Sequence, residues 1–230
     1  MSNLYESVQI ASLYPDAFGV AAPASPVGRE VWPRQPGVFI RQVAVKAEEA
    51  ADADQPAREL PARELVAGQF GLVPRWVKSA SDAKLRSTKL VNARSETVTT
   101  SNNFRDAWLG GQRCIVPMMA FLEDDWRSGK AVPTRIARVD GQPMGVAGLW
   151  ESWTGTGGDV IVSYTLLTVN ANSHALMNRY QQPGNEKRML AILNEGAFDA
   201  WLSARPEKAR EFMRAYPANW LTANPVEKKR

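Results

Sequence analysis

Apolar positions gather in short segments along the chain, at the alternating or continuous spacing that is typical of β-strands. We predict strands in six such segments, which Gly, Asp and Pro separate from one another: 37–46, 113–117, 132–138, 144–152, 160–169 and 188–193. Few helical segments lie between them. The pattern therefore predicts a mostly antiparallel β-sheet or barrel core with flanking helices, which belongs to the α+β class.

Helical spacing of apolar residues marks three short segments, at 101–111, 197–204 and 206–216. In the first of these, Phe104 and Trp108 lie four residues apart and would share one face of a helix. Ser101 or Asn102 would cap this helix, and Gly110 could close it. The other two segments would form amphipathic helices near the end of the domain.

Two stretches interrupt this pattern. Residues 19–36, rich in Pro and small side chains, predict an extended, irregular arm. Residues 47–65 hold most of the acidic side chains of the early chain and contain the pentapeptide PAREL twice in tandem. Five residues are too few for a structural repeat, so we interpret this stretch as a solvated loop between strands. With a frayed tail at 224–230, residues 1–230 are expected to form a single domain with an acidic loop insertion around 47–65.

Composition narrows the class of protein. An apolar fraction of 44% over 230 residues is that of a folded domain with a substantial core. No run approaches the ~18 apolar residues of a membrane span, and the first residues lack the basic region and apolar core of a signal peptide. The single cysteine cannot form an intramolecular disulfide. We therefore expect a cytoplasmic protein without membrane contact.

The basic residues of the chain outnumber the acidic ones by 28 to 24, which fits a polyanionic partner, although many ordinary enzymes are equally basic. Arg75, Arg113 and Arg188 are candidate phosphate contacts. Trp76, Trp126 and also Phe70 could offer flat faces to nucleic acid bases, since stacking contributes ~1–3 kcal/mol per base. Because most of the eight tryptophans must belong to the core, each of these aromatic contacts has a structural alternative.

Asn92 and Arg94 follow the apolar pair Leu90-Val91. Arg94 could present its planar fork to a phosphate, while Asn92 offers both a donor and an acceptor to a polar substrate group. In the alternative interpretation, Arg94 forms an ion pair with another side chain and Asn92 caps a turn. The residues alone leave both interpretations open.

Glu123 follows an apolar segment and is a candidate for proton transfer. A carboxyl group in a partly apolar cleft has a raised pKa, which prepares it for acid–base chemistry near neutral pH. Alternatively, Glu123 points at water. Asp124 and Asp125 follow directly, so that either of them could be the solvated residue instead.

Two further side chains invite a chemical role. Cys114 lies in a segment that reads as a buried strand, so we interpret its thiol as a small hydrophobic group. His174 is the only histidine, which excludes a site with several histidine ligands. We interpret His174 as a structural or capping residue and expect neither a metal nor a cofactor.

Three motifs occur in the order FGLVPRWVK, VNARSET and RCIVPMMAFLEDDW within residues 70–126. Together they resemble the SRAP family (SOS-response-associated peptidase, or abasic-site-processing, domain), and the resemblance extends over roughly 37–216 outside the acidic loop. It implies a single SRAP-type domain that binds single-stranded DNA and traps abasic sites covalently in the DNA damage response. It also implies that Asn92 and Arg94 belong to the DNA-binding cleft and that Glu123 shuttles protons during attack on the abasic sugar.

Two positions depart from the family pattern. SRAP proteins begin Met-Cys and use the freed cysteine to close a thiazolidine ring on the abasic aldehyde, whereas position 2 is Ser here. Ser2 would still carry an α-amine that can form a Schiff base, but its hydroxyl would close a weaker ring. The family's active-site histidine falls at Gln181, and glutamine can form hydrogen bonds but cannot transfer a proton.

These departures leave three functions open. In a residual enzyme, Ser2 supplies the amine, Glu123 transfers protons and Asn92 orients the sugar, with Gln181 in the fourth catalytic position. In the interpretation we favour, the chain is a degenerate module that binds single-stranded or abasic-site DNA through a basic groove, associated with the nucleoid, with its crosslinking activity weakened or lost. A protein-interaction role that uses the acidic insertion is the third.

Overall fold

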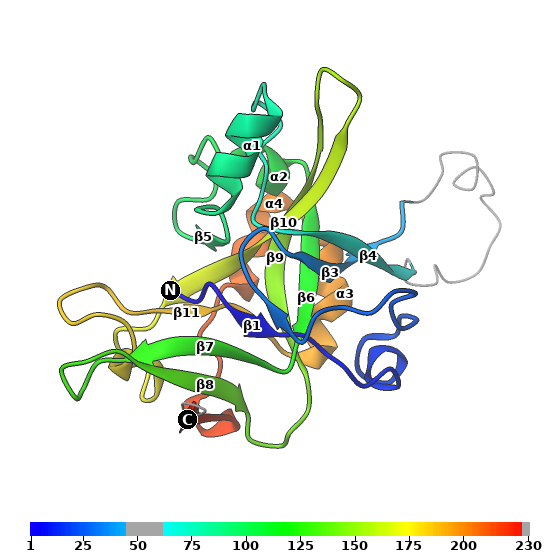
Figure 1. Ribbon diagram of the computed structural model, residues 1–230. Helices are drawn as coiled ribbons and strands as arrows, with labels where there is room; N and C mark the ends of the chain where they lie inside the picture. Colours follow the sequence, from blue (N-terminus) through cyan, green and yellow to red (C-terminus); the bar gives the residue numbers. More distant parts are fainter. Residues whose placement is uncertain (45–61, 227–230) are drawn as a thin grey trace.

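The computed structural model describes residues 1–44 and 62–226 of the chain. Five strands close into a barrel at its centre, each hydrogen-bonded to the next (Figure 1). In order around the barrel they are β3 (Pro36–Gln42), β4 (Arg63–Phe70), β10 (Val160–Asn170), β9 (Met144–Thr154) and β6 (Arg113–Met118). Within this barrel only β4 and β10 run parallel. The prediction of an α+β fold with a mostly antiparallel barrel core is confirmed.

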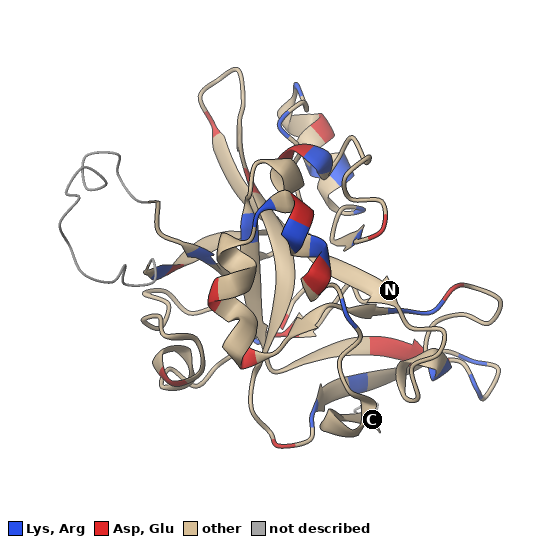
Figure 2. Cartoon of the chain, turned by 180° about the vertical axis from the view of Figure 1, so that it is seen from behind, with Lys and Arg blue, Asp and Glu red and all other residues tan. Residues whose placement is uncertain are grey.

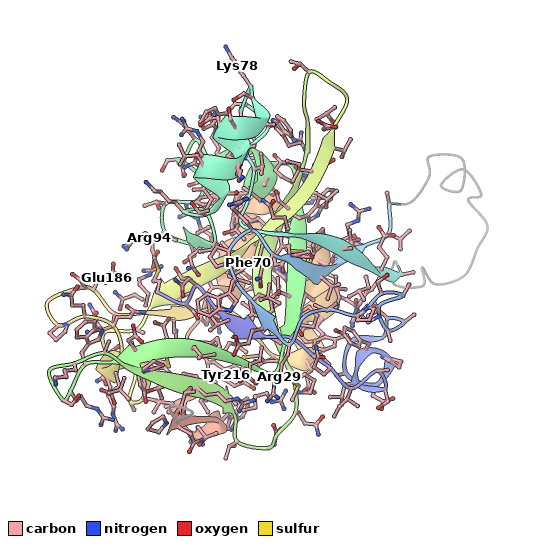
Figure 3. The ribbon with its side chains drawn as sticks, in the orientation of Figure 1. Arg29, Phe70, Lys78, Arg94, Glu186 and Tyr216 are labelled. Carbon is pink, nitrogen blue, oxygen red and sulfur yellow. The ribbon has the colours of Figure 1, made fainter. Side chains whose placement is uncertain are left out.

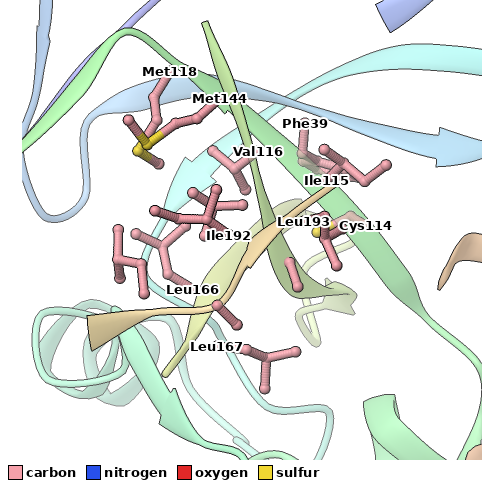
Figure 4. Close-up of a cluster of buried hydrophobic side chains, with 14 of the residues drawn as sticks. Phe39, Cys114, Ile115, Val116, Met118, Met144, Leu166, Leu167, Ile192 and Leu193 are labelled. Carbon is pink, nitrogen blue, oxygen red and sulfur yellow. The ribbon is translucent and has the colours of Figure 1, made fainter. Parts of the chain in front are cut away.

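The barrel strands are apolar enough to build the core from side chains on both of their faces. All six residues of β6 are buried, and so are seven consecutive residues of β10, from Ser163 to Val169. Figure 4 shows part of this cluster, to which Phe39, Ile115 and Leu166 contribute. Full burial of one such side chain contributes about 1.5–3 kcal/mol. The barrel is therefore a firm support for the segments that leave its strands.

A second sheet of five strands lies beside the barrel (Figure 1). Its order is β13 (Leu221–Pro225), β8 (Val132–Arg138), β7 (Ala120–Asp125), β1 (Tyr5–Glu6) and β2 (Glu30–Val31). Strand β1 is antiparallel to both of its neighbours, and Tyr5 pairs with Val31 on one side and with Phe121 on the other. Consequently, the residues that precede β1 lie between the segment that follows β2 and the second half of β7.

Three short strands complete the sheets: β5 (Asn92–Arg94), β11 (Arg188–Leu190) and β12 (Ile192–Leu193). The predicted strand at 188–193 is therefore two strands. At Ala191 the chain passes from one barrel strand to the next, because its N–H donates to the Leu167 carbonyl and its carbonyl accepts from the Ala147 N–H, both at 2.9 Å. As a result β11 pairs with β10, whereas β12 pairs with β9.

Short helical segments cover the outside of the strands. They are η1 (Tyr14–Phe18), α1 (Ala80–Ser87), α2 (Arg105–Leu109), η3 (Met177–Arg179), η4 (Glu195–Ala197), α3 (Phe198–Ser203), α4 (Pro206–Ala209), η5 (Arg210–Phe212) and η6 (Ala218–Trp220). In Figure 1, α1 lies at the top of the view, and α3 and α4 lie behind the barrel strands. No helix in the described residues has the length and apolar character needed to cross a membrane.

Two predicted helices are shorter than expected. The segment at 101–111 is helical only over α2, where Phe104 takes the cap position without a side-chain hydrogen bond. The predicted caps Ser101 and Asn102 are wrong because the chain before Phe104 forms turns, in which the Ser101 N–H donates to the Thr97 carbonyl. Phe104 and Trp108 are both buried, as one shared face requires. The last predicted helix, 206–216, ends as α4 and η5 at Phe212.

Several strands were not predicted. Residues 63–65, which we assigned to the acidic insertion, are the first residues of β4, and Glu64 is paired there with Arg41 at 2.6 Å. The remainder of the insertion up to residue 61 lies outside the described residues. In the tail, Asn224 and Pro225 are not frayed but belong to β13, which pairs with β8. The predicted strand at 37–46 ends at Gln42, whereas those at 113–117, 132–138, 144–152 and 160–169 agree with the structure to within two residues at each end.

Candidate functional site

A cavity of about 700 Å³ opens where the N-terminal residues, the end of β7 and the loop before β11 come together. Its wall includes five residues that the sequence singled out: Arg94, Glu123, Trp126, Gln181 and Arg188. Ser2 lies between two further wall residues, Met1 and Asn3. The fold therefore gathers residues from five distant parts of the chain around one cavity.

Ser2 is held firmly by the second sheet and by the barrel. The N-terminal segment runs beside β7, and the Leu122 N–H donates to the Leu4 carbonyl at 3.1 Å. The Ser2 hydroxyl donates to the Leu122 carbonyl at 2.9 Å, and the Ser2 carbonyl accepts from Asn92 Nδ2 at 2.7 Å. Because only 3% of Ser2 is exposed, its hydroxyl is committed to this contact.

Asn92 reaches Ser2 from β5, which pairs with β10 of the barrel. Its Nδ2 is bonded to Ser2, but its Oδ1 is buried and has no hydrogen-bond partner in the described part of the chain. A buried acceptor without a partner costs about 1–3 kcal/mol. Asn92 therefore orients the N-terminal segment and offers an unused acceptor next to it, which is not the turn cap of the alternative interpretation.

Glu123 is the inward-facing carboxylate of the Glu123-Asp124-Asp125 run. It lies within β7, paired with Thr134, and is 7% exposed, whereas Asp124 is exposed. Burial raises the pKa of Glu123 to about 7, although the Met1 amino group, a hydrogen bond from Gln181 and the Ser2 backbone pull the pKa in the opposite direction. The Met1 nitrogen lies 3.7 Å from Glu123 Oε2. A group that exchanges a proton near neutral pH thus stands beside an amine.

Gln181 lies beside Glu123 in the cavity wall, in a strained backbone conformation. Its φ of 68° lies in the left-handed region, which a residue other than glycine adopts only when its surroundings hold it there. Its N–H donates to the Asp124 carbonyl at 2.9 Å. Its side chain donates to the Arg188 carbonyl at 2.8 Å and accepts from the Arg188 N–H at 3.1 Å. Gln181 therefore fixes the loop between β10 and β11 against β7, a task that needs an amide side chain.

Arg94, Glu186 and Arg188 form an ion-pair network at the cavity rim (Figure 3). Arg94 Nη2 lies 2.6 Å from Glu186 Oε2, and Arg188 Nη1 lies 3.1 Å from Glu186 Oε1. The Asn170 hydrogen bond, followed by Arg94 and Arg188, holds the pKa of Glu186 at about 2. Arg188 is 2% exposed and also donates to both oxygens of Glu96. Of the two arginines, Arg94 is the one that solvent reaches.

Other residues that the sequence singled out lie outside the cavity. Phe70 is fully buried, and Arg113 is buried with its guanidinium bonded to the Trp201 and Trp108 carbonyls, so neither side chain is placed to contact a nucleic acid. Arg75 pairs with Glu151 at 2.7 Å. Trp76 is 41% exposed, but the guanidinium of Arg86 lies over its ring at 4.7 Å.

The cavity wall is not the basic groove that we predicted. Two arginines, Arg94 and Arg188, stand against three carboxylates, Glu123, Asp124 and Glu186. Basic side chains gather instead along and beside α1, as Figure 2 shows. Three of them, Lys78, Lys84 and Lys89, form no salt bridge with any described residue.

Trp32 lines the cavity and was missed by sequence reasoning. It stands in the Pro-rich arm, outside every motif, and 44% of it is exposed. The available signal was a tryptophan in a segment too irregular to bury it.

Two residues behave as the sequence predicted. Cys114 is buried in β6, and His174 caps a turn by accepting from the Leu176 and Met177 N–H groups.

The geometry allows one kind of chemistry in particular. An amine beside a carboxyl group of raised pKa can add to a carbonyl group, because the carboxyl group can supply and accept the protons that the addition moves. Among the described residues, no three His, Cys, Asp or Glu side chains are placed to share a metal ion.

Known proteins match nearly the whole chain. The family described as SOS response associated peptidase (SRAP) matches residues 14–229. The abasic site processing protein YoqW of Bacillus subtilis is 30% identical over 162 residues, which cover 69% of this chain and 67% of that protein. The abasic site processing protein HMCES of Gallus gallus is 26% identical over 185 residues, which cover 71% of this chain and 53% of HMCES. The chain thus spans about half the length of HMCES.

Solved structures extend this likeness to the fold. A crystal structure of a protein from Bordetella bronchiseptica has a TM-score of 0.85 and 38% sequence identity, and covers 99% of this chain and 100% of that one. A protein from Bacteroides thetaiotaomicron, with a TM-score of 0.77 and 20% identity over 98% of this chain and 92% of its own, shares the fold. From the family match over residues 14–229, we conclude that this chain belongs to the SRAP family.

Proposed function

We propose that the protein binds single-stranded DNA that contains an abasic site and holds the abasic sugar in the cavity beside Ser2. The observation that carries this proposal is the convergence of Ser2, Asn92 and Glu123 from three distant segments beside the cavity, whose wall includes Glu123. Relatives that bear the name abasic site processing protein support it. A DNA-damage role in the cytoplasm, close to the nucleoid, is part of the proposal.

The reactive group would be the α-amine of Ser2 after removal of Met1. An abasic site in its open form carries an aldehyde, and the amine adds to this carbon to give a carbinolamine, which loses water to form an imine. Glu123, with a pKa of about 7, supplies the proton to the departing hydroxyl group and then takes the proton from nitrogen. The buried Oδ1 of Asn92 is the acceptor available to a sugar hydroxyl.

A stable ring is not expected to follow. A thiol at position 2 would add to the imine carbon, whereas a hydroxyl group is the poorer nucleophile. The Ser2 hydroxyl also donates to the Leu122 carbonyl and is 3% exposed, so that ring closure must first break this hydrogen bond. We therefore propose that covalent capture is weak and reversible and that DNA binding is the stronger activity.

Binding would be shared between the cavity rim and the surface near α1. At the rim, Arg94 is the accessible guanidinium for a phosphate, and Trp126 offers an aromatic face. Lys78, Lys84 and Lys89 extend the positive charge beyond the cavity, toward Trp76. Neutralising phosphates with such side chains releases counterions and makes the affinity fall with salt.

A binding module without any covalent step is the alternative function. Two observations favour it: Gln181 cannot transfer a proton, and its side chain is already used to hold Arg188. The two functions differ in one measurement. Borohydride reduces an imine between the protein and abasic single-stranded DNA to a stable secondary amine. The resulting covalent adduct is then detected on a denaturing gel.

The expected result for the first function is a trapped adduct that disappears when the N-terminal amine is acetylated. A protein that binds the DNA with a salt-dependent affinity but gives no adduct is the binding module. Failure to bind abasic or intact single-stranded DNA at low salt contradicts both, and leaves a protein-interaction role for the chain.

A further inference from the structure

Trp32 lies on the opposite side of the N-terminal segment from Glu123. Strand β2 ends at Val31, which pairs with Tyr5, and β7 passes Tyr5 at Phe121 on the other side. Both strands run antiparallel to β1, so Trp32 follows β2 at the same edge of the sheet where Glu123 lies in β7. Two strand spacings, roughly 10 Å, separate the backbones of β2 and β7. Ser2 therefore stands between a wall that carries Glu123 and a wall that carries Trp32.

The backbone around Trp32 is held rigidly. Trp32 to Gln35 form a turn in which the Gln35 N–H donates to the Trp32 carbonyl at 3.0 Å. Arg34 has a φ of 70°, a left-handed conformation that is strained for a residue other than glycine. Phe70, at the buried end of β4, bonds this turn on both sides, to the Arg34 N–H and to the Gln35 carbonyl. A strained turn anchored in the barrel presents Trp32.

The indole ring of Trp32 is oriented but not covered. Its Nε1–H donates to Glu30 Oε2 at 3.3 Å, which satisfies its one polar group. None of the described aromatic rings or arginines stacks on it, in contrast to Trp76, which Arg86 covers, and Trp150, which Arg41 covers. With 44% of the residue exposed in the cavity wall, an apolar face is open to a flat ligand.

From this geometry we infer that Trp32 is a stacking platform for the nucleobase next to the abasic nucleotide. The inference rests on the proposed function, because it places the abasic sugar at Ser2 and Glu123. An abasic nucleotide has no base of its own to stack on the Trp32 ring. The base that stacks there must therefore belong to an adjacent nucleotide. Trp126 lines the same cavity from the β7 side, which leaves the neighbour on the other side of the lesion to Trp32.

The test measures anisotropy of a labelled single-stranded oligonucleotide whose central nucleotide is tetrahydrofuran, an abasic analogue without an aldehyde. Two further oligonucleotides carry the same central analogue. One of them also lacks the base of the 5′ neighbour, and the other lacks the base of the 3′ neighbour. For the wild-type protein, loss of one particular neighbouring base should weaken binding roughly 5- to 100-fold, the range for one base on one aromatic ring. For Trp32→Ala, the first oligonucleotide should bind weaker by the same factor, and removal of that base should cause no further loss.

Trp32→Phe should keep most of the wild-type affinity, and Trp220→Ala, a change at an exposed tryptophan away from this cavity, should keep all of it. The slope of affinity against salt should stay unchanged in Trp32→Ala, because no phosphate contact is removed. If Trp32→Ala and removal of either neighbouring base weaken binding additively, or if Trp32→Ala binds like the wild type, the stacking role is wrong. If the wild-type protein binds none of the oligonucleotides, the proposed function fails and takes this inference with it.

Discussion

The Arg94 guanidinium lies 2.6 Å from the Glu186 carboxylate at the rim of the cavity. The same carboxylate contacts Arg188 and Asn170, so two guanidinium groups share the single negative charge of Glu186. A DNA phosphate that binds Arg94 must therefore take the place of Glu186. Under the proposed function, Glu186, on the loop between Gln181 and Arg188, would thus compete with the phosphate for Arg94.

Replacing Glu186 by glutamine should raise the affinity for single-stranded DNA. The amide keeps the size of the side chain but removes the charge that competes with phosphate. Because an ion pair between solvent-exposed side chains is weak, we expect only a modest increase, of up to about fivefold at low salt. Anisotropy titrations measure it, with Glu195→Gln as control, since Glu195 pairs with Arg138 away from the cavity. Unchanged or weaker binding by Glu186→Gln would contradict the competition.

Arg94→Ala should weaken binding and should lower the slope of log affinity against log salt by about 1, as expected for the loss of one phosphate contact. Ser2→Ala should leave the affinity unchanged, because the Ser2 side chain is buried against Leu122. Arg205→Ala, at an exposed arginine outside the cavity wall, is the matched control. An equal effect of Arg94→Ala and Arg205→Ala would show that only net charge matters.

Glu123 should make stability depend on pH. Its pKa is about 7 in the folded protein, against an ordinary value of 4.5. The folded state therefore binds the proton more tightly, and the resulting stability is present below pH 4.5 and is lost as pH rises through 7. Glu123→Gln does not titrate, so its free energy of unfolding relative to wild type should rise over this range, by at most about 3–4 kcal/mol at about 1.4 kcal/mol per pKa unit.

Urea unfolding at several pH values between 4.5 and 8 measures this difference. Asp124→Asn serves as control, because Asp124 is the exposed neighbour. A difference between wild type and Glu123→Gln that stays constant with pH would mean that Glu123 is ionised throughout.

Ser2→Cys should give a more persistent adduct with abasic DNA than the wild type, because a thiol closes the five-membered ring. Adding Gln181→His restores the proton-transfer group of the family but removes the amide that bonds both backbone groups of Arg188. We expect this second change to lower stability by roughly 1–3 kcal/mol. Denaturing gels without borohydride detect the adduct, and thermal melting detects the loss. No adduct from either variant would mean that the rest of the cavity no longer supports capture.

His174→Ala should destabilise the protein. The Nδ1 atom of His174 accepts from the Met177 N–H at 2.9 Å, and its Nε2 contacts the Tyr216 carbonyl at 2.6 Å. Loss of both leaves buried backbone groups without partners, at a cost of roughly 2–4 kcal/mol. His174→Asn, which can still accept from the backbone, should lose less, as urea unfolding would show. Equal stability of the three proteins would contradict a capping role.

The sequence predicted those parts of the fold that depend on local pattern. The barrel strands were visible because long apolar runs such as 160–169 form one strand each. Strand β1 was not visible, because two residues become a strand only when β2 and β7 lie on either side of them. The predicted helix caps failed for a different reason: local turns, in which the Thr100 and Ser101 N–H groups donate to the Thr97 carbonyl, precede α2, which begins only at Arg105.

Motifs mark several residues of the candidate site in the sequence, whereas the burial of a side chain is not marked there. Ser2, Asn92 and Glu123 come together as the family resemblance implied. The sequence shows that residue 113 is an arginine, but it does not show that this guanidinium is hydrogen-bonded to backbone carbonyl groups in the interior. The sequence also does not reveal that Glu186 forms an ion pair with Arg94, because the two residues lie some ninety positions apart and no local pattern connects them.

The position of the first residues has a practical consequence for anyone who prepares this protein. Since Met1 stands in the cavity wall beside Glu123, a purification tag fused ahead of it must leave the molecule through the space that a ligand needs. Material tagged in this way would lack the free N-terminal amine and would hold extra chain at the cavity, so a negative result with it would not test the proposed function.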